Sequence, residues 1–160
     1  MTSTLSPNQG WDAIQNQLFC VLGMVNQQNQ ARTVGVVYAV QDRKLYVGTG
    51  IDTWKTKHIQ GNPHISVTVP IPKRVPFLPW IMIPQATITF SGTATITEAR
   101  KINHDLLKDI FRHKVDDPTF LNDTCVIEII PHGEFVTYGV GVPLMKMRHP
   151  DQARGRAPVG

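Results

Sequence analysis

The chain has 160 residues, of which 41% are hydrophobic and 18% are charged, and its formal net charge is +4. This length suits a single domain over residues 1–160 that buries about two thirds of its unfolded surface, and the composition excludes a disordered chain. No apolar run is long enough to cross a membrane, and the start MTSTLSPNQGWDAI lacks the features of a secretory signal. We therefore expect a cytoplasmic protein with no membrane partner.

The first third of the chain predicts one helix and three strands. Within residues 1–18, the apolar side chains of Trp11, Ile14 and Leu18 recur at helical spacing. Ser6 or Asn8 could cap the N-terminus of this helix. The apolar runs 19–25, 32–40 and 44–50 are short, and the polar turns NQQNQ and QDRK separate them. Such turns predict an antiparallel meander rather than a βαβ unit.

The middle of the chain predicts a short helix followed by two longer strands. The helix begins at Asp52 or Thr53 and ends at Gly61 and Pro63. Residues 64–71 and 86–98 alternate apolar and polar side chains, as strands with one buried face do. Gly92 stands where a bulge or bend would help a barrel to close.

Between these two strands lies a loop, residues 71–84, that contains several prolines and large apolar side chains. The prolines exclude a regular helix and a central strand. An apolar patch of this kind either folds over its own barrel or contacts another chain, a ligand or a lipid surface.

The last third predicts a second amphipathic helix, two final strands and a basic tail. Ile102, Leu106 and Ile110 recur at four-residue spacing within 99–114, and residues 124–131 and 134–140 are strand-like. Residues 140–160 combine turn formers with clustered basic residues and predict a tail or arm. The set amounts to about six strands, and an antiparallel barrel is how such strands avoid exposed edges.

The order of parts resembles the pyridoxamine 5′-phosphate oxidase-like FMN-binding split-barrel family. The similarity is carried by FCVLGMV, ARTVGVVYAV, LYVGTG and DTWKTKHIQGNPHISVTV between residues 19 and 69, and later by SGTATITEA and CVIEIIPHGEFVTYG. The resemblance implies a mainly β (α+β) fold: a six-stranded antiparallel split barrel with Greek-key character and flanking short helices. It also implies a homodimer that holds FMN at the subunit interface.

The resemblance places the cofactor on residues that match the family's pattern. These are Arg32 and Val34 in RTV, Thr49 in VGTG, and Thr53 and Lys55 in TWK. Trp54 stands where a common variant of the family has arginine, so Lys57 or Arg32 would have to make up the charge. A helix N-terminus independently favours a phosphate, because its free N–H groups and positive dipole end face the anion.

The function predicted on this basis is an FMN-dependent oxidoreductase acting on a small planar or aromatic substrate. The alternative is a non-catalytic cofactor-binding or sensing protein that holds flavin, deazaflavin F420 or haem. Two groups could face the substrate: Phe77 and Trp80 for an apolar acceptor, or Arg148, Arg154 and Arg156 for a pyridoxine-type phosphate. No catalytic acid or base can be identified from the sequence.

Other chemistries find little support in the sequence. The six histidines lack a ligand spacing, so we expect no metal. The basic residues are scattered rather than arranged as a stripe with aromatic residues, so we expect no nucleic acid. Cys20 and Cys125 lie in apolar runs and are predicted to be ordinary buried thiols.

Overall fold

The computed structural model describes residues 3–160, so Met1 and Thr2 of the predicted segment 1–18 lie outside the described residues. The strands are β1 (Ser3–Thr4), β2 (Phe19–Val25), β3 (Ala31–Val37), β4 (Ala39–Gln41), β5 (Lys44–Gly50), β6 (His64–Ile71), β7 (Ala86–Glu98), β8 (Thr124–Tyr138) and β9 (Arg154–Pro158). The α-helices are α1 (Pro7–Gln15), α2 (Trp54–Gly61), α3 (His104–Phe111), α4 (Pro118–Asn122) and α5 (Pro150–Ala153). Three 3₁₀ helices complete the set: η1 (Ala99–Lys101), η2 (Arg112–Lys114) and η3 (Leu144–Arg148).

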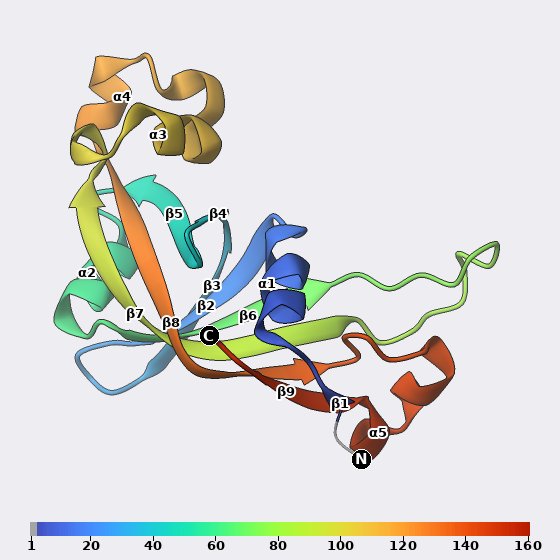
Figure 1. The fold of residues 1–160 in the computed structure, drawn as a ribbon. Coiled ribbons are helices and arrows are strands. Elements are labelled where there is room, and N and C mark those ends of the chain that lie inside the picture. The colour runs from blue at the N-terminus through green and yellow to red at the C-terminus, as the bar shows by residue number, and fades with distance from the viewer. Residues whose placement is uncertain (1–2) are drawn as a thin grey trace. The chain divides into compact units, whose positions relative to one another are not determined.

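The strands form one hydrogen-bonded sheet in the order β1-β9-β8-β7-β6-β2-β3, and β5 joins it by pairing with both β8 and β4 (Figure 1). The pairs β2–β3, β4–β5, β5–β8 and β8–β9 are antiparallel, whereas β1 and β9 are parallel. The predicted class is therefore confirmed: a mostly antiparallel sheet with short helices, of the split-barrel kind. The predicted strand count was wrong, because residues 3–160 contain nine strands rather than six.

The residues group into two compact units. The terminal unit contains the chain up to Gln17 with Thr68–Phe90 and His132–Gly160, and the central unit contains Leu18–Val67 with Ser91–Pro131. Strands β6, β7 and β8 each contribute residues to both units. Whether the chain is one domain in the folding sense stays a prediction.

The terminal unit is organised around one aromatic side chain. Phe135 is fully buried, and its ring makes edge-on contacts with Trp11 and Phe90, each at 5.4 Å between ring centres. Helix α1 comes so close that a Cβ on Gly10 would lie 2.7 Å from the Phe135 ring. Ser6 caps α1 in a reciprocal capping box with Gln9, which is one of the two predicted caps.

The predicted tail is instead part of the terminal unit's structure. Residues 140–160 form η3, α5 and β9, and β9 pairs with β8 from Glu134–Pro158 to Tyr138–Arg154. Val159 follows β9, and its carbonyl oxygen accepts a hydrogen bond from the Trp11 indole Nε1 at 2.8 Å. The sequence predicted a tail because RGRAP contains few apolar side chains and two arginines, so it shows no hydrophobic pattern of a strand. Pairing with β8, rather than hydrophobic pattern, makes it a strand.

The central unit packs apolar side chains on both sides of β5 and β8. Opposed pairs such as Leu45–Ile129 and Val47–Ile127 are fully buried. A second cluster joins β5 and β8 to α3 through Tyr46, Val126, Leu106 and Leu107. This cluster holds α3 in place, because Leu106 and Leu107 lie in it and the other large apolar residues of the helix, Ile110 and Phe111, pack against it.

Three boundaries differ from the sequence-based expectation. The run 32–40 is broken at Tyr38, whose N–H bonds the Leu18 carbonyl at 3.1 Å, so it yields β3 and β4. The runs 124–131 and 134–140 merge into the single strand β8, and Pro131 does not interrupt it. The helix predicted over 99–114 is η1, α3 and η2, because Asn103 caps a new helix by accepting from Leu106 N at 2.9 Å.

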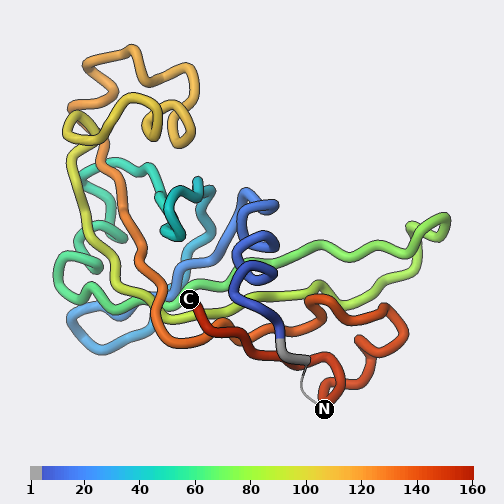
Figure 2. Tube along the Cα trace, viewed as in Figure 1, coloured from blue at the N-terminus to red at the C-terminus, as the bar shows by residue number. Residues whose placement is uncertain are grey.

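The segment between β6 and β7 has no regular secondary structure, as its prolines predicted. We call residues 72–85 the proline loop. Figure 2 shows it as a long excursion from the ends of the two strands that it joins. None of the helices in residues 3–160 is long and apolar enough to span a membrane.

Candidate functional site

The step from β5 into α2 brings together three of the predicted cofactor residues. Thr49 is buried on β5 opposite Cys125 of β8, and Thr53 is the N-cap of α2. The Thr56 hydroxyl lies 2.6 Å from the carbonyl oxygens of both Ile51 and Thr53, which fixes the turn between strand and helix. The Thr53 hydroxyl accepts weakly from Thr56 N at 3.5 Å, so the other amides of the first turn remain directed at the start of the helix.

Lys55 is the third member of this group. Its side chain is half-buried, and its charge lowers the pKa of the Cys125 thiol, in opposition to burial, which raises that pKa more strongly. Among residues 3–160 the ion pairs involve other cations, and none includes Lys55. A half-buried ammonium without a carboxylate partner is a ready position for an anion, because burial strengthens charge interactions.

The structure separates Lys57 from Lys55. Two residues along an α-helix turn the side chain through about 200°, so the two lysines point to different sides of α2. Lys57 is exposed, and its backbone N–H bonds Thr53 O at 3.3 Å. Lys57 could therefore replace the charge that is missing at Trp54 only for a phosphate that approaches from the side of α2 opposite Lys55.

A shallow hollow of about 580 Å³ opens beside the start of α2. It is lined by Gly50, Ile51, Asp52, Thr53, Asn122 and Asp123. Its two carboxylates repel a phosphate that enters from this side. Lys55 does not line the hollow, so an anion at the first turn of α2 is favoured on the lysine side.

The two other predicted cofactor residues lie on β3. Arg32 is opposite Met24 and Val34 is opposite Leu22, and β3 ends the sheet's main path. Arg32 is exposed, and its Nη2 lies 3.4 Å from Gln30 Oε1, a long contact that leaves the guanidinium accessible. Val34 is half-buried. These two residues thus belong to a strand surface and not to the strand-to-helix step.

A cavity of about 250 Å³ in the central unit was not predicted from the sequence. We call it the tyrosine cavity; it is lined by Leu18, Val37, Tyr38, Tyr46, Gly48, Asp109, Ile110 and Arg112. Gly48 was the available signal, since a glycine inside a strand often marks a close approach. A Cβ there would lie 2.4 Å from the Phe111 ring and 2.6 Å from Ile110 Cγ2.

The two phenols of the tyrosine cavity stay protonated at neutral pH. Burial, and then the charge of Glu128, raises the pKa of Tyr46 to about 12, and its hydroxyl donates to Glu128 Oε2 at 3.2 Å. Lys44 Nζ lies 3.3 Å from the same oxygen. Burial also raises the pKa of Tyr38. The cavity therefore offers apolar walls and neutral phenols, and Asp109 and Arg112 are the charged residues of its lining.

The predicted substrate-facing residues all belong to the terminal unit. Phe77 and Trp80 are exposed in the proline loop, and Arg148 is exposed in η3. Arg154 and Arg156 lie on β9, where Arg156 Nη1 bonds Glu134 Oε2 at 2.8 Å. The ion pair leaves Arg156 less available to a phosphorylated ligand than the sequence suggested.

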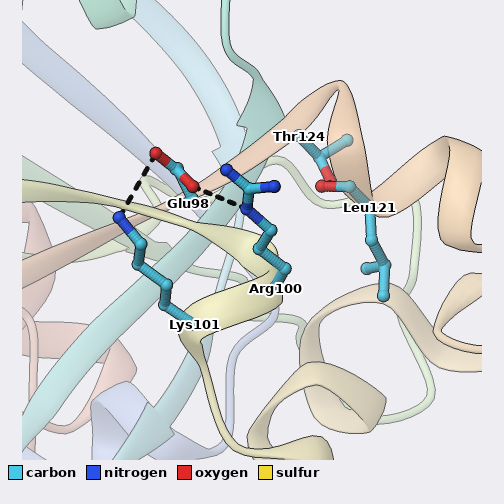
Figure 3. A network of polar contacts seen from close by, with 5 residues as sticks. All are labelled: Glu98, Arg100, Lys101, Leu121 and Thr124. Atoms are coloured by element: carbon cyan, nitrogen blue, oxygen red, sulfur yellow. Dashed lines mark hydrogen bonds and ion pairs between the residues drawn. The ribbon is translucent and has the colours of Figure 1, made fainter.

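A surface charge network marks the step from β7 into η1 (Figure 3). Glu98 Oε2 accepts from Arg100 Nε at 2.8 Å, and Glu98 Oε1 lies 3.3 Å from Lys101 Nζ. The hydrogen bond from Arg100, with a further one from Lys101, lowers the pKa of Glu98. Figure 3 also shows Thr124, the first residue of β8, whose hydroxyl lies 3.4 Å from the carbonyl oxygen of Leu121. The three side chains pair with one another at the surface, where ion pairs contribute little to stability.

Both cysteines are free and buried, as predicted. Burial raises the pKa of the Cys20 thiol from 9.0 to about 12. Thiolate reactivity at neutral pH is therefore suppressed. Within residues 3–160, no three His, Cys, Asp or Glu side chains come together as metal ligands, and the absence of a metal stays a prediction.

The Cys20 pKa predicts a loss of stability in alkali. The unfolded thiol ionises near pH 9 and the folded one near 12, so the free energy of unfolding falls between these values. The slope from this group is about 1.4 kcal/mol per pH unit. Cys20→Ala should show a shallower decline than wild type in urea melts across this window. Parallel declines would show that Cys20 does not contribute.

Comparison with known families and structures is consistent with this geometry. The family model described as pyridoxamine 5′-phosphate oxidase matches residues 11–136, which is most of the chain. The chain belongs to this family. The match includes β3, β5 and α2 with its N-cap, which carry every predicted cofactor residue of the pyridoxamine 5′-phosphate oxidase pattern. No curated protein matches the chain significantly in sequence.

Solved structures share the fold at low sequence identity. The haem storage protein HutZ from Vibrio cholerae has a TM-score of 0.64 at 14% identity, over 81% of this chain and 92% of HutZ. An FAD-binding protein from Mesorhizobium loti has a TM-score of 0.62 at 15% identity, over 81% of this chain and 91% of that one. An F420 reductase has a TM-score of 0.56 at 16% identity, over 78% and 93%. At these identities the likeness shows the fold alone.

Proposed function

We propose that the protein is an FMN-binding flavoprotein and an oxidoreductase for a small planar or aromatic substrate. The observation that carries the proposal is the half-buried, unpaired Lys55 beside the first turn of α2, in a chain of the pyridoxamine 5′-phosphate oxidase family. A bound flavin would supply the redox chemistry, and the protein would bind and orient it.

The residues present fit the phosphate end of FMN. The phosphate would accept from Lys55 Nζ and from the first-turn amides of α2, with Thr53 at the cap position. Thr49, near the end of β5, is paired with Cys125 of β8. The Lys55 charge acts on the Cys125 thiol, so Lys55 and Thr49 lie in the same region. Arg32 and Val34 on the exposed strand β3 would contact the remainder of the cofactor, and Lys57 would contribute only at long range.

Replacing Lys55 by alanine tests this assignment. One charge-assisted hydrogen bond is worth about 1.5–3 kcal/mol, so Lys55→Ala should weaken FMN binding about tenfold or more. Stability without cofactor should change by less than about 0.5 kcal/mol, because the side chain makes no ion pair. Quenching of flavin fluorescence during titration measures the affinity.

Lys57→Ala is the matched control, since it removes the same charge from the same helix. It should change FMN affinity by no more than about threefold, which is the size expected for a screened surface charge. Equal weakening by both substitutions would show that general positive charge, and not a directed contact from Lys55, holds the phosphate.

We also propose a homodimer with the cofactor at the subunit interface. The family commonly forms dimers, and β3 presents an exposed surface at the end of the sheet's main path. Light scattering at micromolar concentration should give about twice the chain mass of 17.9 kDa. A mass equal to that of one chain, measured with FMN present, would contradict a shared site.

The substrate class follows from the charges that remain available. A pyridoxine-type phosphate needs several free basic groups, and Arg156 is already paired with Glu134. Phe77 and Trp80 would offer flat apolar walls to an aromatic acceptor. We therefore favour the planar or aromatic substrate over the phosphorylated one.

A second candidate is a cofactor-binding or sensing protein without turnover. The same fold occurs in a haem storage protein and in an F420 reductase, and the phenols of the tyrosine cavity supply no acid or base near neutral pH. Anaerobic addition of NADH or NADPH to the FMN-loaded protein separates the two. Bleaching of the flavin spectrum supports the oxidoreductase, and an unchanged spectrum with tightly held flavin supports the binding protein.

A further inference from the structure

The proline loop exposes large apolar side chains to an unusual degree. Phe77 and Met82 are 96% and 94% exposed, Trp80 is 73% exposed, and Leu78 and Ile81 are more than one third exposed. These five residues lie within six positions of one another. Scattered apolar residues are normal on a surface, but a contiguous patch of this kind marks a contact with something apolar.

The loop's backbone holds this patch outward. Four prolines, at 72, 76, 79 and 84, restrict its backbone. Two local bonds, Leu78 N to Val75 O at 3.3 Å and Ile81 N to Leu78 O at 3.1 Å, fold the tip into consecutive turns. Phe77 adopts φ 64°, a left-handed conformation that non-glycine residues seldom take. A stiff loop loses little conformational entropy when its tip becomes buried.

The charges around the patch are of one sign. From Thr53 to Thr97 the sequence contains no Asp or Glu, so the loop, β6 and β7 up to its last residue carry no carboxylate side chain. Lys73 and Arg74 lie at the base of the loop, and no ion pair within residues 3–160 includes them. An occupant of the patch must therefore tolerate or supply negative charge.

The size of the patch argues against a protein partner. A stable interface between two proteins takes about 20–30 residues from each side, whereas the loop tip offers five apolar side chains. A second copy of the chain docked loop to loop would also oppose Lys73 and Arg74 with the same cations. A bilayer surface needs no large complementary contact area, since it accepts a narrow apolar tip. It also places lipid phosphates, which attract Lys73 and Arg74, beside the inserted residues.

We propose that the proline loop docks the protein on an anionic lipid surface. Phe77, Trp80 and Met82 enter the boundary between headgroups and acyl chains, and Lys73 and Arg74 contact lipid phosphates. This is a peripheral contact, which requires no membrane-spanning helix. It replaces the sequence-based expectation of no membrane partner, because exposure of the loop tip could not be read from the sequence. It does not depend on the cofactor proposed above, and it assigns Phe77 and Trp80 to the lipid surface instead of to the substrate walls.

Co-sedimentation with lipid vesicles tests the proposal on the full-length protein. We expect binding to vesicles of phosphatidylcholine mixed with phosphatidylserine and much weaker binding to phosphatidylcholine alone. Trp80→Ser and Met82→Ser should each weaken binding about tenfold, from lost apolar insertion. Lys73→Ala and Arg74→Ala should each weaken it about fivefold, and added salt should weaken it further.

Two matched substitutions serve as controls outside the loop. Met145 is 85% exposed in η3 and Lys108 is exposed on α3, so Met145→Ser and Lys108→Ala remove the same groups elsewhere. Both should bind vesicles as wild type does, and thermal melts should show that all six variants are folded. Absence of binding to either vesicle overturns the proposal. Equal losses in the control and loop variants overturn it too, as does a loop substitution that converts a dimer to a monomer without altering vesicle binding.

Discussion

Phe135→Ala should destabilise the protein by about 3–5 kcal/mol, the range observed when a fully buried phenylalanine is truncated. Its ring is inaccessible to solvent and contacts the rings of Trp11 and Phe90, and α1 approaches it at Gly10. Alanine leaves a cavity that these rigid rings cannot fill, so both transfer free energy and packing are lost. Urea denaturation followed by tryptophan fluorescence measures the change, because Trp11 itself reports on this site.

Phe77→Ala is the matched control, since the same atoms are removed from a side chain that is almost fully exposed. It should shift the free energy of unfolding by less than about 0.5 kcal/mol. If the two substitutions cost the same, the aromatic cluster around Phe135 is not the centre of the terminal unit.

Ending the chain at Ala153 should have a comparable or larger effect. The truncation removes β9, and with it the pairing to β8, the buried side chains of Ala157 and Val159, and the acceptor of the Trp11 indole. An unsatisfied buried donor costs about 1–3 kcal/mol, and loss of a buried valine costs about as much again. We expect a melting temperature about 10 °C lower, since each kcal/mol shifts it by about 2–4 °C in domains of this size.

Removal of Gly160 alone is the control for this truncation, because that residue is exposed and lies beyond β9. It should leave the melting temperature unchanged. An equally stable chain ending at Ala153 would show that residues 154–160 are a dispensable tail. The expected instability also means that the role of Arg154 or Arg156 in substrate binding must be tested by point substitution.

Local pattern was sufficient for the elements with one buried face. Strands β2, β5, β6 and β7 alternate or run apolar, and Thr53 and Ser6 are capping residues by their chemistry, so these elements were predictable. The order of these elements was also sufficient to indicate the family. The family model, matched over residues 11–136, confirms that interpretation.

Elements that depend on distant partners were missed or misplaced. Strand β9 exists because β8 pairs with it, and the break between β3 and β4 falls at Tyr38, whose N–H bonds the Leu18 carbonyl. Neither fact leaves a periodic signal in the local sequence. Likewise, the family's pattern placed Lys55 on the phosphate and offered Lys57 as compensation for Trp54, but it could not show that Lys55 is half-buried and Lys57 exposed. The tyrosine cavity combines residues from four separate segments, and only Gly48 carried a local signal of a close approach.

The acidic hollow beside α2 refines the proposed cofactor site. Asp52 and Asp123 lie near the first turn, so a phosphate held by Lys55 is stabilised by one cation and opposed by nearby carboxylates. We therefore expect FMN to be held less tightly than it would be at the same site without these two carboxylates. We expect Lys55 to be the main side-chain donor to the phosphate, since the other lysine of α2, Lys57, is exposed.

FMN binding is tested by the absorption spectrum of the purified protein after incubation with excess FMN and gel filtration. We expect a flavin spectrum to elute with the protein and much less flavin to be retained by Lys55→Ala. Elution of the protein without flavin, while haemin incubated in the same way is retained, would contradict this expectation.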